Sequence, residues 1–148
     1  MTTHDGHEAS SSPYKKQLPI IHPENAPYWE SLKKHELRLQ RCTECATLRY
    51  PVSPVCYQCM STKPATWEQV SGKGKLSSWI VVERATGNVA WSEDVPYVVA
   101  CVDLDEGPRL TTNIVEADPW SLTTQMAVEV VFDDVTPEVT LAKFRPAK

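Results

Sequence analysis

The 148-residue chain has no apolar run long enough for a signal peptide or a membrane-spanning helix. We therefore expect a cytoplasmic protein that makes no use of a membrane. In that reducing compartment thiols stay free, so the cysteines are expected to be available for metal binding rather than to form disulfides.

Histidine is scarce, and none follows residue 35; the four histidines are His4, His7, His22 and His35. General acid–base and nucleophilic catalysis both need a positioned base, which is most often histidine. The fifth cysteine, Cys101, has no histidine near it in the sequence to activate it, and we expect it to be a small core residue. The sequence therefore predicts a protein without an active site of its own.

Four of the cysteines form two Cys-x-x-Cys pairs, Cys42 with Cys45 and Cys56 with Cys59, and ten residues separate the pairs. This spacing is typical of a zinc ribbon, in which two turns bind one tetrahedral ion through four thiolates. Four sulfur ligands leave no open position for water or substrate, so the Zn²⁺ is predicted to be structural. An iron site of the rubredoxin type, used in electron transfer, is the alternative.

Glycine is missing from the two places where zinc-binding turns commonly have it. Ala46 and Met60 follow the second cysteine of each pair, where the backbone usually turns with a positive φ angle. We therefore expect the metal to bind in turns that depart from ideal geometry.

The N-terminal part divides at residue 24. Residues 1–24 mix serine, proline, histidine and charge without periodicity, and are predicted to be disordered or held by a partner. Residues 25–65 are predicted to contain a short helix and the ribbon. Pro27 in the first turn, with Tyr28, Trp29 and Leu32 at helical spacing, predicts that helix at about 26–35. It is too short to be stable alone and must pack on another part.

Residues 66–148 change to the period-two pattern of strands. Strands are predicted at 75–84, 96–105, 109–115, 128–132 and 139–144, with a single helical turn at 118–122. Residues 85–95 are predicted to be a loop with an exposed Trp91. Five strands in this length fit a small Greek-key barrel of the OB type. The predicted fold class is therefore mainly β: a short N-terminal helix, a zinc ribbon and a C-terminal five-stranded OB-fold barrel.

Basic residues are unevenly spread. Residues 66–148 carry seven Lys and Arg against thirteen Asp and Glu, which argues against binding to a phosphate backbone. Nucleic-acid binding is nevertheless the alternative function, because zinc ribbons and OB folds both occur in nucleic-acid-binding proteins. The densest basic cluster is a candidate patch for an anionic ligand or an acidic partner, or else a solvated face. Its members are Lys33, Lys34, Arg38, Arg41 and Arg49.

The order of these parts resembles a family of acyl-CoA-associated proteins that have an N-terminal helix, a rubredoxin-like zinc ribbon and a C-terminal OB fold. The resemblance covers roughly residues 25 to 146. It is carried by residues 36–42, the four cysteines, and residues 70–76, 96–99, 104–110 and 144–146. Residues 124–127 depart from it, because family members usually have a glycine before the next strand, so this turn is expected to differ.

The resemblance implies a non-catalytic accessory subunit that binds a thiolase-fold enzyme in a hetero-oligomer. The partner would carry out carbon–carbon bond chemistry on an acyl-CoA, either acyl transfer and thiolysis or retro-aldol cleavage of a steroid or fatty side chain. The OB domain is expected to help bind the acyl-CoA. Only the four cysteines transfer from the family as ligands. From their chemistry, six further residues are candidate contacts to acyl-CoA or the partner: Trp29, Arg38, Arg41, Lys75, Trp79 and Tyr97.

Overall fold

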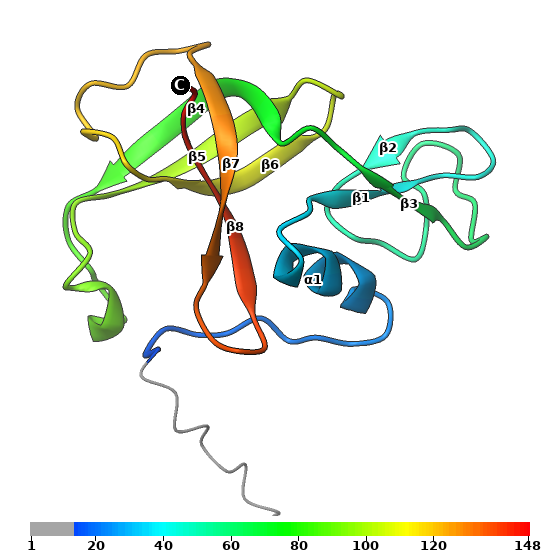
Figure 1. Cartoon of the computed structure of the whole chain (residues 1–148), viewed down its shortest axis with the longest axis horizontal. Coiled ribbons are helices and arrows are strands. Elements are labelled where there is room, and N and C mark those ends of the chain that lie inside the picture. Colours follow the sequence, from blue (N-terminus) through cyan, green and yellow to red (C-terminus); the bar gives the residue numbers. More distant parts are fainter. Residues whose placement is uncertain (1–13) are drawn as a thin grey trace, which may run out of the picture.

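The computed structural model describes residues 14–148 and shows a helix, a small sheet and a barrel (Figure 1). The helix is α1 (Ala26–Lys33), and a short 3-10 helix η1 (Val89–Trp91) follows later. The sheet has the order β2-β1-β3, with β1 (Arg38–Arg41), β2 (Leu48–Arg49) and β3 (Thr66–Gln69). The closed barrel has the order β4-β5-β6-β8-β7, with β4 (Lys73–Val82), β5 (Tyr97–Leu104), β6 (Arg109–Ile114), β7 (Ala127–Asp134) and β8 (Thr140–Pro146). The mainly-β fold class is confirmed.

Helix α1 begins one residue before Pro27, whose fixed φ angle suits the first turn. It ends at Lys33, two residues earlier than predicted, and His35 just beyond it has a φ angle of 57°. Tyr28 and Leu32 are buried on the face of the helix that lies against β1 and β8 (Figure 1). The short helix is therefore held by packing rather than by its own propensity.

One apolar core joins all three parts. Leu32 of α1, Leu39 of β1, and Leu76 and Phe144 of the barrel belong to a single cluster, and each is at most 1% exposed. The helix, the sheet and the barrel therefore share buried surface, and each part depends on the others for its stability.

The barrel strands alternate between buried and less buried residues, as predicted. In β5, Val98, Ala100, Val102 and Leu104 are buried, so Cys101 lies on the opposite face and is half-buried. The prediction of Cys101 as a core residue is therefore wrong. Its position follows from the period of two, because a residue adjacent to buried Ala100 and Val102 must point the other way.

Two predictions about the loops are also corrected. Residues 118–122 form a hydrogen-bonded turn instead of a helical turn, in which the Asp118 carboxylate accepts the N–H of Trp120 at 3.0 Å. Trp91 is half-buried rather than exposed, because η1 brings its ring to 4.8 Å from that of Tyr97. In the turn at 124–127, Gln125 adopts a φ angle of 63°, the conformation for which glycine would be expected.

Residues 14–24 lie outside helices and strands and run past the barrel to α1 (Figure 1). Lys16 forms an ion pair with Asp94, and its Nζ lies 4.5 Å from the centre of the Trp91 ring. The remainder of the predicted tail, with His4 and His7, lies outside the described residues. Among the described helices, none is long and apolar enough to cross a membrane.

The substitution Gly74→Ala tests how closely β4 and β5 approach each other. A Cβ atom at this position would lie 2.5 Å from the backbone oxygen of Asp103, so Gly74→Ala must push the two strands apart. We expect the free energy of unfolding to fall by about 1–3 kcal/mol in urea denaturation. Ser78→Ala, at an exposed position of the same strand, is the control and should change it by less than about 0.5 kcal/mol. Equal stability of the two variants would contradict the close packing described here.

Candidate metal centre and candidate contact residues

The four cysteines of the ribbon converge on one point. Their Sγ atoms all lie within 4.8 Å of one another, with Cys42 and Cys59 3.6 Å apart and Cys45 and Cys56 3.7 Å apart. A tetrahedral ion with metal–sulfur bonds of about 2.3 Å separates its sulfur ligands by about 3.8 Å. A disulfide would need about 2.05 Å. The donor set therefore fits a four-coordinate metal ion.

The two metal-binding turns have the same backbone pattern, although neither contains glycine. The N–H of Ala46 donates to the carbonyl of Cys42 at 3.0 Å, and the N–H of Met60 donates to that of Cys56 at 2.8 Å. Ala46 and Met60 adopt φ angles of 61° and 63°. Alanine and methionine thus take the left-handed conformation that glycine usually supplies, and the expected departure in geometry is not found.

Backbone N–H groups favour the thiolate form of the inner pair of cysteines. Those of Cys45 and Glu44 lower the pKa of Cys42, and those of Cys59 and Gln58 lower the pKa of Cys56 to about 6. The thiolate is the form that binds a metal. Cys42 and Cys56 are buried, whereas Cys45 and Cys59 lie on the outer side.

Two of the five members of the predicted basic cluster form ion pairs. Arg38 pairs with Glu36, and Arg41 forms two hydrogen bonds of 2.7 and 2.8 Å to the Glu68 carboxylate. Arg41 also donates to the carbonyl of Ala46, which ties β3 and the first metal-binding turn to β1. These arginines therefore brace the ribbon.

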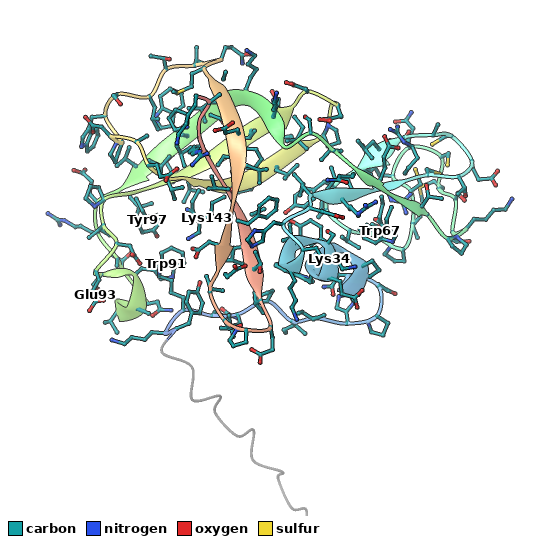
Figure 2. All side chains as sticks on the ribbon, in the orientation of Figure 1. Lys34, Trp67, Trp91, Glu93, Tyr97 and Lys143 are labelled. Atoms are coloured by element: carbon teal, nitrogen blue, oxygen red, sulfur yellow. The ribbon has the colours of Figure 1, made fainter. Side chains whose placement is uncertain are left out.

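Arg49, another member of the predicted cluster, is buried. Only 2% of it is exposed, and its guanidinium donates to the side-chain oxygen of Gln40 at 3.3 Å and to the carbonyl of Ser53 at 3.0 Å. Buried polar groups of this kind are satisfied by hydrogen bonds. Of the cluster, Lys33 at the end of α1 and Lys34 just beyond it are exposed. Lys34 is labelled in Figure 2.

The structure does not bring the six candidate contact residues together on one surface. Arg38 and Arg41 belong to the ribbon, Lys75 is exposed on β4, and Trp79 on the same strand is half-buried against the core. Trp29 packs edge-on against Tyr28 on α1, with ring centres 5.1 Å apart. Their contact with a ligand or a partner therefore stays a prediction.

Tyr97, the sixth candidate, lies in a different setting that the sequence did not reveal. Its ring centre lies 4.8 Å from that of Trp91 at an interplanar angle of 35°, and both residues line a cavity together with Lys143 (Figure 2). Asn113 also lines this cavity. Asn113 and Lys143 were missed because each stands in a strand pattern as an ordinary polar position. Only the pairing of β6 with β8 brings them together.

His35 links the helix to the barrel. Its ring is stacked on that of Phe132 at 5.1 Å, and its Nε2 lies 3.0 Å from both carboxylate oxygens of Asp134. A hydrogen bond from Thr140, and then that from His35, lowers the pKa of Asp134. These contacts explain why a residue with an unfavourable φ angle is held at the end of α1.

The geometry defines a class: a four-cysteine ribbon joined to a five-stranded OB-fold barrel. Residues 29–65 match the family described as "ChsH2, rubredoxin-like zinc ribbon domain". Residues 67–133 match that described as "ChsH2, C-terminal OB-fold domain". The chain therefore belongs to the ChsH2 (DUF35) family.

Several curated proteins are similar to this chain. A probable enoyl-CoA hydratase alpha subunit of Thermomonospora curvata is 39% identical over 131 residues, covering 87% of this chain and 39% of that protein. A 3-oxo-4,17-pregnadiene-20-carboxyl-CoA hydratase alpha subunit of Mycobacterium tuberculosis is 32% identical, covering 83% and 38%. The chain thus spans about two fifths of these alpha subunits. A DUF35 domain-containing scaffold protein of Methanothermobacter thermautotrophicus is 33% identical, covering 72% and 78%.

Two solved structures share the fold. A chain of the Ltp2-ChsH2(DUF35) aldolase superimposes with a TM-score of 0.78 and 38% identity, covering 88% of this chain and 100% of that chain. A DUF35 protein of unknown function from Sulfolobus solfataricus gives a TM-score of 0.60 at 12% identity, which supports the fold alone.

Cys56→Ser tests the metal centre. Cys56 is buried and its thiolate is one of four ligands, so we expect the bound metal to fall from about one ion per chain to a small fraction of that. Because metal binding and folding of such a ribbon are coupled, residues 42–65 should become sensitive to protease. Elemental analysis and limited proteolysis provide the measurements.

Cys101→Ser is the matched control, because Cys101 lies on β5 outside the cluster. It should retain the full metal content and protease resistance. Full metal content in Cys56→Ser would remove Cys56 from the ligand set.

Proposed function

We propose that this chain is an accessory subunit that binds a thiolase-fold enzyme and supports its carbon–carbon bond chemistry on an acyl-CoA. The observation that carries the proposal is the likeness to a chain of the Ltp2-ChsH2(DUF35) aldolase, all of which is covered at 38% identity. The names of other relatives, a scaffold protein and alpha subunits of CoA-thioester hydratases, point to the same kind of assembly.

The partner supplies the reacting groups in this proposal. The reaction is acyl transfer and thiolysis, or retro-aldol cleavage of a steroid or fatty side chain. A relative named for a pregnadiene-carboxyl-CoA supports the steroid variant. The barrel helps to bind the acyl-CoA, and the six candidate contact residues defined above face the ligand or the partner.

The ion in the ribbon is Zn²⁺ in this proposal, and its role is structural. The four thiolates fit a tetrahedral ion, and the match to a zinc ribbon family supports this metal over iron. With all four positions filled by sulfur, the ion stabilises the turns that follow β1. In this proposal the ion holds the four cysteines together and takes no part in a reaction.

Nucleic-acid binding receives less support. Residues 66–148, which include the barrel, carry seven Lys and Arg against thirteen Asp and Glu, and Arg49 of the basic cluster is buried. A binding surface for a nucleic acid needs cations that are free to replace counterions.

Co-expression with a thiolase-fold enzyme from the same genome tests the proposal. We expect the two chains to co-elute in size-exclusion chromatography, and acyl-CoA cleavage to need both chains. Elution as separate species, with cleavage unaffected by this chain, would refute the accessory role. Salt-sensitive binding of single-stranded DNA or RNA instead would support the alternative.

A triple variant tests the contact residues within such a complex. Arg38→Ala, Arg41→Ala and Lys75→Ala together remove three cations that could bind phosphate or carboxylate groups. We expect KM for the acyl-CoA to rise about tenfold or more, because a hydrogen bond to a charged group is worth about 1.5–3 kcal/mol.

The matched control removes three other lysines, Lys33, Lys34 and Lys63, and so produces the same change in net charge. It should leave KM within about twofold, because screened surface charges contribute little. Equal effects of the two triple variants would show that net charge, and not these positions, governs the binding.

A further inference from the structure

Two cavities lie end to end on the barrel wall and share the residues Asn113 and Lys143. The first has a volume of 330 Å³, and its lining includes the rings of Trp91 and Tyr97, whose centres lie 4.8 Å apart. The second has a volume of 190 Å³ and is bounded on one side by Trp29. We call the two together the seam groove. Their combined size is that of a site for a small molecule.

The groove exists because two neighbouring strands of the barrel separate. β6 and β8 are paired in register at a single position, Ile114 with Phe144. Next to it the hydroxyl of Thr112 donates to the carbonyl of Ala142 at 3.0 Å, so a side chain spans a gap that a backbone ladder would otherwise close. The side chains along this gap line both cavities.

The walls of the groove combine apolar and charged side chains, because Lys16, Asp94, Glu116 and Lys143 line the first cavity beside its aromatic and aliphatic residues. In the second cavity, Tyr28 packs edge-on against Trp29, and Leu110, Leu141 and Ala142 complete the lining. Aromatic rings therefore bound the groove at both ends, at Trp91 and at Trp29. An occupant should be elongated, with an apolar group at each end.

The middle of the groove offers one acceptor and one donor. The amide nitrogen of Asn113 donates to the carbonyl of Val98 at 2.9 Å, and no donor within residues 14–148 reaches its Oδ1. The Nζ of Lys143 donates to Asp133 at 2.5 Å, which leaves two of its three N–H groups for other acceptors. An acceptor next to a donor is the complement of an amide group, which has one N–H and one carbonyl.

The N-terminal segment contributes Lys16 to the lining of the first cavity. Lys16 lines this cavity, pairs with Asp94 and lies over Trp91. Its side chain shields the aromatic wall from solvent, which strengthens polar interactions inside the groove.

We propose that the seam groove is a binding site for an elongated apolar molecule with a secondary amide near its middle. The amide N–H donates to Oδ1 of Asn113, and the amide oxygen accepts from Lys143. The apolar ends pack against Trp91 and Tyr97 in the first cavity and against Trp29 in the second. The site is formed by residues of this chain, so binding to it can be measured without the partner proposed above.

Fluorescence of the neutral probe N-phenylnaphthylamine tests the site on the full, metal-loaded chain. We expect saturable binding of about one probe per chain, with energy transfer from tryptophan. Two competitors of equal length, N-hexylhexanamide and hexyl hexanoate, differ only in an N–H replaced by oxygen. The amide should displace the probe at about tenfold lower concentration, because the ester leaves the Asn113 oxygen unpaired.

Three variants distinguish binding of the probe in the seam groove from non-specific hydrophobic binding. Thr111→Trp, at an exposed position that lines the second cavity, should weaken probe binding about tenfold, whereas Thr123→Trp, exposed and outside both cavities, should leave it unchanged. Asn113→Leu should abolish the preference for the amide over the ester. Non-saturable binding, equal displacement by both competitors of the unmodified chain, or no effect of Thr111→Trp would each overturn the proposal.

Discussion

The contact on which the rest of the structure depends is the convergence of four thiolates behind β1. The turn that carries Cys42 continues directly from β1, and the ligands of the second turn reach back to it. β1 in turn pairs with β2 and β3 and contributes Leu39 to the core shared with the helix and the barrel. A ribbon of this size buries too little apolar surface to be stable alone. The metal therefore orders the strand on which the helix and the barrel pack.

Electrostatics in the chain serve this architecture more than they serve a ligand. Arg41 is held by Glu68 and by the carbonyl of Ala46, so its charge stabilises the ribbon. Arg145 in the barrel likewise contacts Glu116 and Glu129. These arginines therefore hold segments of the chain together.

Local patterns in the sequence predicted the parts whose structure is local. Two Cys-x-x-Cys pairs place four ligands at a fixed spacing, and strand alternation follows from a period of two; both predictions were confirmed. The burial of Arg49 and the left-handed backbone of Gln125 could not be predicted, because each depends on contacts made by distant segments. The sequence shows that Arg49 is charged and that residue 125 is not glycine. It does not show which neighbours offset the cost of burying the charge or of adopting the left-handed backbone.

The six candidate contact residues show the same limit of sequence-based prediction. Tyr97 could be identified from its type, but its setting beside Asn113 and Lys143 depends on the pairing of β6 with β8, thirty residues further along the chain (Ile114 with Phe144). Because β6 and β8 are paired in register at this one position, a groove remains between the two strands. No periodicity in either strand marks it.

Native mass spectrometry of this chain, co-purified with the proposed thiolase-fold partner, tests the central claim most directly. It reports assembly and metal content in one spectrum. The account predicts a hetero-oligomer whose mass includes about one zinc ion for each copy of this chain. Spectra with only the separate proteins, or a complex that retains its full mass of protein after the metal is removed, would contradict it.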